Sequence, residues 1–304
     1  MAISYPLNTT ETISFEELIE FVTATLDPDD VETLAACTEK LQMLSNNASF
    51  ITDIIHDELS DTGLFQANNT HSAQSLMLFK HANYYMRLNI WPPSSEREDI
   101  RQWQDQLYFY LRAHDHNFDF LTVGYYGSGY GTELWEYDPD SVIGYAGESV
   151  DLTFLEKTRL PKGKAMLYRA SRDIHSQFPP EDYSVSINIL PTTLNIVRRE
   201  QFYFDLENRK IVGTAANNGT GRYLMFNLAA KFGNAKTVNL LEDLAHKHEI
   251  PYVRLKAFDA LSVLTNERTA IWNEAMLDGH QIVSGHARLF LDGTLYNGLR
   301  KRQS

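Results

Sequence analysis

The run AHDHNFDFLTVGYYG, residues 113–127, carries the strongest signal in the sequence for both the fold and its chemistry. It places His114 and His116 just before a stretch of aromatic and β-branched residues. If the run is a strand, its side chains alternate between two faces, so both imidazoles project from one face about 6.5–7 Å apart. Phe118 and Phe120 continue that face. The pattern predicts an apolar barrel interior with two metal-ligating groups near one end.

Segments of the same texture lie on both sides of this run, from about residue 72 to residue 220. They are LMLF, YYMRLNIW, LYFYLRAH, ELWEY, AMLYRA, YSVSINIL, EQFYFDL and KIVGTAA. Short strands with frequent turns are typical of an antiparallel sandwich or barrel. The glycines of GYYGSGYG, residues 124–131, predict a hairpin, because this run lacks the Lys-Ser/Thr pair of a phosphate-binding loop.

The two ends of the chain have helical periodicity. Ser14 with Glu17 predicts a capped helix, and two more helices are expected at 31–46 and 50–59. A single helix is expected after WPPSSERED, capped by Ser94 or Ser95. Beyond residue 221 the pattern is of paired amphipathic helices, with Pro251 at a first helical position. We therefore expect an α+β protein with a helical segment at 1–66, a barrel at 67–220 and a helical region at 221–304.

Composition excludes several classes of function. The chain has 304 residues and a net charge of −13, from 27 Lys and Arg against 40 Asp and Glu. Such an acidic surface repels phosphate backbones, so no nucleic-acid partner is expected. No run reaches about 18 apolar residues, which predicts no membrane partner. The start lacks the features of a secretory signal, so a cytoplasmic location is expected. Cys37 is the only cysteine, which excludes a thiolate metal cluster.

Two further segments complete a candidate site. His175 lies in YRASRDIHSQFPPEDYSVSINIL, residues 168–190, and Arg87 lies in YYMRLNI, residues 84–90. Three neutral imidazoles suit a divalent metal ion and leave coordination positions open. A guanidinium matches a carboxylate with two hydrogen bonds. Together they indicate a metal site beside an anchor for a small carboxylate-bearing substrate.

Across residues 72–200 the order of these motifs resembles the cupin superfamily, and more narrowly its cysteine-dioxygenase-like thiol dioxygenases. Those proteins have an Arg after a Tyr-rich strand, then HDH, a hairpin with glycine, and a third His before a turn with proline. The resemblance implies a cupin-type double-stranded β-helix barrel. It also implies that His114, His116 and His175 hold Fe(II), with Mn, Ni or Zn as alternatives, and that Arg87 binds the substrate beside dioxygen.

The chain departs from that family at its catalytic relay. The Ser-His-Tyr relay falls on Ser186, Asn188 and Leu190, and the position that carries a crosslinking cysteine in some members is Leu121. A thiol substrate is therefore not expected. Asn188 still points inward and is a candidate substrate contact.

Other side chains near the run are candidates for supporting roles. Tyr126 is the candidate phenol for bound oxygen, and its neighbours Tyr125 and Tyr130 could instead line the barrel mouth. If the strand geometry differs, a carboxylate could join the metal shell. The candidates for that ligand are Asp119, Glu133 and Glu136.

The run VRLKAFDALSVL, residues 253–264, resembles a HEAT-type helix pair, within a region near 223–280. This resemblance implies a protein partner bound through the C-terminal helices. The other seven histidines are expected to have no metal role, and His280 and His286 are expected to be surface residues of a loop. The seven are His56, His71, His81, His246, His248, His280 and His286.

The resulting prediction is a non-heme Fe(II), dioxygen-dependent oxygenase acting on a small, amino-acid-like substrate. Two alternatives stay open. The same scaffold hosts isomerases and lyases that use a metal as a Lewis acid without dioxygen. A barrel joined to helical repeats could also act as a ligand sensor or interaction protein without catalysis.

Overall fold

The computed structural model describes residues 3–60, 66, 69, 74–215 and 220–295 of the chain. These residues form two compact units. The first consists of residues 1–137, 151–194 and 203–209, and the second of residues 138–150, 195–202 and 210–304. The division predicted from the sequence, at 1–66, 67–220 and 221–304, stays a prediction. The N-terminal helices share a core with the barrel, and two inner segments of the chain belong with the C-terminal helices.

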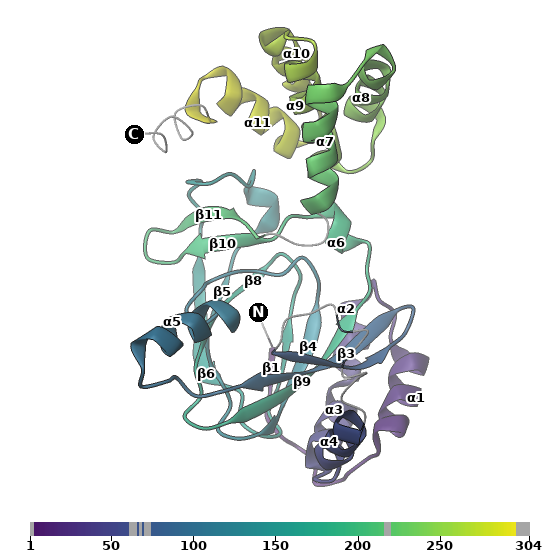
Figure 1. The fold of residues 1–304 in the computed structure, drawn as a ribbon, viewed down its shortest axis with the longest axis vertical. Helices are drawn as coiled ribbons and strands as arrows, with labels where there is room; N and C mark the ends of the chain where they lie inside the picture. Colours follow the sequence, from purple (N-terminus) through teal and green to yellow (C-terminus); the bar gives the residue numbers. More distant parts are fainter. Residues whose placement is uncertain (1–2, 61–65, 67–68, 70–73, 216–219, 296–304) are drawn as a thin grey trace. The chain divides into compact units, whose positions relative to one another are not determined.

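The first unit contains two antiparallel sheets (Figure 1). The larger has the order β1 (Ile3–Tyr5), β7 (Ala165–Tyr168), β4 (Phe120–Tyr126), β9 (Ser184–Pro191), β3 (Tyr84–Trp91) and β2 (Ser75–Lys80). The smaller has the order β6 (Thr153–Arg159), β5 (Gly131–Glu136) and β8 (Asp173–Phe178). Strand β10 (Phe202–Asp205) follows later in the chain. The predicted antiparallel architecture and α+β class are confirmed.

The inner faces of the two sheets share one aromatic core. Phe120 of β4 and Tyr168 of β7 stack with ring centroids 4.4 Å apart, and both pack with Leu134 of β5 in the opposite sheet. Side chains alternate between the two faces of β3. Tyr84 and Met86 belong to a second apolar core on the outer face of the larger sheet, while Tyr85 packs against the aromatic core inside. Side chains at odd-numbered positions of β3 therefore point into the barrel.

Four N-terminal helices cover the outer face of the larger sheet. They are α1 (Phe15–Thr25), α2 (Val31–Ala36), α3 (Thr38–Asn46) and α4 (Phe50–Ser60). Their apolar side chains form one core with those of β3, β4, β7 and β9. The predicted capping box of Ser14 and Glu17 is present. The predicted helix over 31–46 is instead two helices that meet at Cys37, where the backbone N–H bonds to the carbonyl of Leu34 in a tighter turn than that of an α-helix.

The remaining helix of the first unit is α5 (Glu98–Leu107). It begins later than predicted. Its N-cap is Arg97, without a side-chain hydrogen bond to the helix, in place of Ser94 or Ser95. Ser95 instead accepts a hydrogen bond from the Arg97 backbone N–H, at 3.2 Å, and so shapes the turn before the helix.

The second unit is mainly helical (Figure 1). Its elements are η1 (Pro139–Ser141), α6 (Asn195–Arg198), β11 (Lys210–Thr214), α7 (Thr220–Phe232), α8 (Ala235–Lys247), α9 (Pro251–Leu264), α10 (Arg268–Ala275) and α11 (Gln281–Leu291). Helix α9 supplies much of the buried core, and Pro251 begins it as predicted. No helix in the described ranges has both the length and the apolar character needed to cross a bilayer.

Gly129 is required by the hairpin between β4 and β5. Its φ is +78°, and a Cβ there would meet the carbonyl oxygen of Leu160. We expect Gly129→Ala to lower the free energy of unfolding by more than about 2 kcal/mol, because it combines backbone strain with a clash against main chain. Gly213→Ala is the control, since nothing lies within 4 Å of the added methyl group. Equal urea midpoints for the two variants would contradict this reading.

Candidate metal centre

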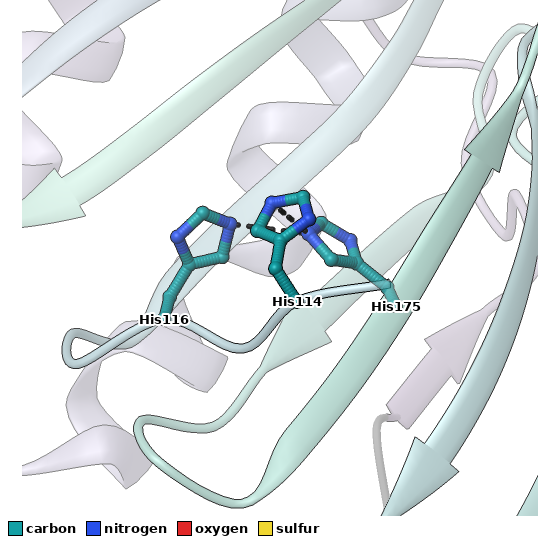
Figure 2. A group of neighbouring side chains, drawn as sticks. All are labelled: His114, His116 and His175. Carbon is teal, nitrogen blue, oxygen red and sulfur yellow. Dashed lines mark hydrogen bonds between the residues drawn. The ribbon is translucent and has the colours of Figure 1, made fainter. Parts of the chain in front are cut away.

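Three histidines from two parts of the first unit converge at one end of the barrel (Figure 2). His114 and His116 come from the segment before β4, and His175 comes from β8. Their ligand atoms all lie within 4.8 Å of one another. The Nε2 atom of His175 is 3.1 Å from Nε2 of both His114 and His116. The structure thus brings together the three histidines that the sequence singled out, in a group that could hold a metal ion.

The backbone around His114 and His116 is not the predicted strand, because β4 begins only at Phe120. His114 instead makes isolated bridges to His175 and to Tyr203. The N–H of His114 donates to the carbonyl of His175 at 3.0 Å, and the N–H of His175 donates back at 2.9 Å. This pair of hydrogen bonds holds His114 and His175 side by side. The irregular segment that follows His114 directs the His116 side chain toward the other two imidazoles.

His114 is in the tautomer that can bind a metal ion through Nε2. Nδ1 of His114 lies 2.8 Å from the carbonyl oxygen of Arg112, so Nδ1 carries the proton and Nε2 presents a lone pair. Burial lowers the pKa of all three imidazoles. The pKa of His116 is lowered further by electrostatic interactions with His114, His175 and Arg87. The three side chains are therefore neutral near pH 7.

The spacing of these nitrogens fits a small divalent ion. A first-row metal binds imidazole nitrogen at about 2.0–2.1 Å, which places nitrogens on adjacent positions about 3.0–3.4 Å apart. The observed 3.1 Å lies in that range. At this distance either a shared Nε2–H or a cation bound by the lone pairs can join the rings, so the spacing is compatible with a bound cation.

The candidate carboxylate ligands lie in other interactions. The carboxylate of Asp119 accepts from the N–H of Ala170 at 2.7 Å. Glu133 pairs with Lys157 at 2.7 Å. Glu136 pairs with Arg169 and Arg172, each at 3.2 Å. Among the described residues the group that could hold a metal ion consists of the three histidines, without a carboxylate.

Arg87 points into the same barrel. It lies on β3 in register with Asn188 of β9, which is in register with Thr122 of β4. The Arg87 side chain is half-buried, and its Nε is fully buried with no hydrogen-bond partner among the described residues. Burial lowers its pKa, but a guanidinium stays charged at neutral pH. The interior therefore holds a fixed positive charge for which the described part of the chain provides no ion pair.

Two buried tyrosines belong to the aromatic core inside the barrel, and of these only Tyr130 was a candidate from the sequence. Arg87 acts electrostatically on Tyr130, and the Tyr168 hydroxyl lies 3.9 Å from the sulfur of Met166. Burial raises the pKa of Tyr130 to about 12 and raises the pKa of Tyr168 well above its usual value, so both remain phenols. The Tyr168 ring also lies 4.8 Å from the His175 ring. The inward alternation of AMLYRA could have indicated Tyr168.

Tyr126, the predicted phenol of the site, is 61% exposed at the end of β4. Tyr125 faces the helices instead, and it donates to the carbonyl of Asn47. A bulge between Gly124 and Tyr126 changes the register against β9 and turns Tyr126 outward. A tyrosine that donates inside the barrel is therefore better sought at Tyr130, 3% exposed.

Asp115, between the two histidines of the HDH motif, supports the centre from behind. It is fully buried, and Tyr137 donates a hydrogen bond to its carboxylate at 2.7 Å. No pattern in the sequence singles out Tyr137, because the contact joins segments that meet only in the fold. By holding Asp115, Tyr137 restrains the backbone that aims His114 and His116.

We expect Tyr137→Phe to weaken metal binding about 10-fold, the lower end of the effect of losing a supporting hydrogen bond around a metal site. Competition with a chromophoric chelator measures this affinity. Tyr183→Phe, at a position 57% exposed, is the control. Unchanged affinity together with a lower free energy of unfolding would mean that Tyr137 serves the fold alone.

Sequence comparison with protein-family profiles and with curated proteins gives no match. Solved structures show partial similarity. A cupin domain from Bordetella pertussis is 11% identical, over 41% of this chain and 100% of that chain, with a TM-score of 0.20. A hydroquinone 1,2-dioxygenase from Sphingomonas sp. TTNP3 is 10% identical, over 43% of this chain and 75% of that chain, with a TM-score of 0.26. A salicylate 1,2-dioxygenase from Pseudaminobacter salicylatoxidans is 6% identical, over 46% of this chain and 33% of that chain, with a TM-score of 0.25.

A cupin domain and two dioxygenases are thus among the proteins similar to part of this chain. At TM-scores this low the similarity says nothing of substrate or metal. The narrower resemblances to thiol dioxygenases and to HEAT-type helices stay predictions.

Proposed function

We propose that the chain is a cupin-type, non-heme Fe(II) oxygenase that uses dioxygen and acts on a small carboxylate-bearing substrate. One observation carries the proposal: Arg87, whose buried Nε has no partner among the described residues, shares a barrel with three converging neutral imidazoles. Iron bound to such a set supplies open coordination positions and the redox chemistry that dioxygen requires.

The chain's own residues would bind and orient the substrate. Arg87 would bind a carboxylate, which would neutralise a charge that has no ion pair within the described residues. Asn188, in register beside it, offers an amide that can both donate and accept. Tyr130, held as a phenol by burial, is a neutral hydrogen-bond donor near the same guanidinium.

The aromatic wall of the barrel would exclude water from the reacting groups. Phe118 and Phe120 lie against the His116 ring, with centroids 4.8 and 5.1 Å from it. An environment of this kind strengthens the pairing of Arg87 with a carboxylate, because fewer water molecules compete for either group. It also limits the substrate to a small molecule.

Elemental analysis of the purified protein, followed by oxygen uptake with a panel of amino and hydroxy acids, tests the proposal. We expect about one iron per chain and uptake that depends on both the iron and a carboxylate-bearing compound. Turnover that is retained under anaerobic conditions would favour the isomerase or lyase class. Protein that binds no divalent metal would contradict both enzyme classes and favour a non-catalytic role.

A further inference from the structure

The backbone is left-handed at several residues other than glycine, and three of them adjoin the segments that carry the metal-centre histidines. The φ angle is +57° at Phe109, +60° at Leu111 and +52° at Ser171. A residue with a Cβ adopts this conformation at a cost in free energy, because the Cβ crowds the following carbonyl oxygen. Residues of this kind cluster at functional sites, where the surrounding structure holds them in place.

Leu111 lies in a tight reversal of the chain. At Tyr110 the chain bridges Gln177 of β8 in the parallel sense. At His114 it bridges His175 of the same strand in the antiparallel sense. Only three residues lie between these two bridges, and the Leu111 N–H donates to the carbonyl of Gln177 at 2.9 Å. The left-handed conformation of Leu111 therefore belongs to the turn that leads into the first histidine.

This turn brings the carbonyl of Arg112 to the His114 ring, where the oxygen lies 2.8 Å from Nδ1. The contact orients the ring and leaves Nε2 for a metal ion. Tyr110 anchors the turn, since it is 2% exposed and donates to the carbonyl of Pro92 at 3.1 Å. Leu111 itself is 60% exposed. Burial of its own side chain therefore does little to offset the strain in its backbone.

Ser171 has the corresponding position behind His116. It lies in the turn between β7 and β8, and its N–H donates to the carbonyl of His116 at 2.5 Å. Ser171 is 2% exposed, and its hydroxyl has no hydrogen-bond partner among the described residues. The hydroxyl therefore does not account for the left-handed backbone, whereas the N–H links that backbone directly to a candidate metal ligand.

We propose that Leu111 and Ser171 are positioning residues that restrict the backbone on which His114 and His116 are held. While these hydrogen bonds keep φ positive, a residue with a Cβ is confined to the small left-handed region, whereas glycine could adopt a much wider range of φ and ψ. The imidazoles then have less freedom to lose when a metal ion binds. The purpose of this restraint rests on the proposed function, but its effect on His114 can be measured without a metal ion.

Substitutions that remove or keep the Cβ test the assignment through the affinity for Zn²⁺. We expect Leu111→Gly to weaken binding at least 10-fold, while its urea midpoint without metal should not fall, because the strain is relieved. Leu111→Asn should bind as the unchanged protein does, because asparagine keeps the Cβ and adopts the left-handed region readily. Ser171→Gly should also weaken binding, and Ser171→Ala should not. Asn266→Gly is the control, at a φ of +58° between α9 and α10 of the second unit.

¹⁵N NMR of the histidine rings in the metal-free protein gives a second measure. The unchanged protein should show a protonated Nδ1 at His114, and Leu111→Gly should move this signal toward the average of two exchanging tautomers. Leu111→Asn should leave it in place. His286 is the reference, because its Nδ1 lies 2.7 Å from the carbonyl oxygen of Ile282. This histidine is half-buried within α11, which corrects the expectation of a surface loop residue.

The assignment is overturned if Leu111→Gly keeps both the affinity for Zn²⁺ and the His114 signal of the unchanged protein. It is also overturned if Leu111→Asn loses as much as Leu111→Gly, since the loss would then come from the leucine side chain and not from the backbone. An unchanged protein that binds neither Zn²⁺ nor iron would contradict the proposed function. The His114 signal of the metal-free variants would then decide by itself whether the turn restrains the ring.

Discussion

His116→Ala is expected to abolish metal binding and, with it, any turnover. The substitution removes one of three Nε2 ligands and leaves two, which cannot enclose a small divalent ion on one face. We expect a loss in affinity of more than about 100-fold. Elemental analysis after dialysis against a weak chelator measures the bound metal, and an oxygen electrode measures turnover.

The control for this substitution is His246→Ala, at a half-exposed histidine of α8 that contacts Glu274 at 3.4 Å. It should retain full metal content. Thermal unfolding of the metal-free proteins separates loss of the site from loss of the fold, because His116→Ala should melt close to the unchanged apoprotein. If His116→Ala kept both metal and turnover, the three-His assignment would be wrong.

Arg87→Met should have opposite effects on function and on stability. Carboxylate-bearing substrates lose their anchor, so kcat/KM falls by about 100-fold or more, the range for losing a charge-assisted, two-point contact. The free energy of unfolding should instead rise by about 1–2 kcal/mol, because a half-buried charge that has no ion pair among the described residues is replaced by an apolar side chain of similar length. Steady-state oxygen uptake and urea unfolding of the metal-free protein give the two quantities.

Arg159→Met supplies the comparison, since Arg159 pairs with Glu181 on the surface at 2.9 Å. Arg159→Met should change kcat/KM and the free energy of unfolding little. Metal content should be unchanged in both variants, which distinguishes substrate binding from metal binding. An Arg87→Met protein that is less stable than the parent would show that the guanidinium serves the fold and would remove the main support for a carboxylate substrate.

The class of fold could be predicted because it depends on local patterns. The capping box at Ser14, the start of α9 at Pro251 and the alternation along β3 are set by neighbouring residues in the sequence. The errors arose where tertiary contacts decide. The helix predicted over 31–46 is interrupted at Cys37, and the N-terminal helices join the barrel unit through a core that no local pattern shows.

In the candidate site, too, the features set by local sequence patterns could be predicted and those set by tertiary contacts could not. The spacing of His114 and His116 and the motif around His175 were sufficient to choose all three histidines. The irregular backbone that aims them was not predictable, because it depends on hydrogen bonds between the segment at His114 and strand β8. The bulge that turns Tyr126 outward, and the contact of Tyr137 with Asp115, likewise depend on segments that meet only in the fold.

The junction of α2 and α3 gives the first unit an internal reporter of its own opening. Cys37 is the only cysteine of the chain, it is fully buried, and burial raises the pKa of its thiol to about 12. Thiol reagents react with the thiolate, so labelling requires that the helices first leave the sheet. The rate of alkylation should therefore follow the local opening of this layer, and it needs no engineered probe. If a ligand at the metal centre stabilises the whole unit, it should slow labelling at a thiol outside the barrel.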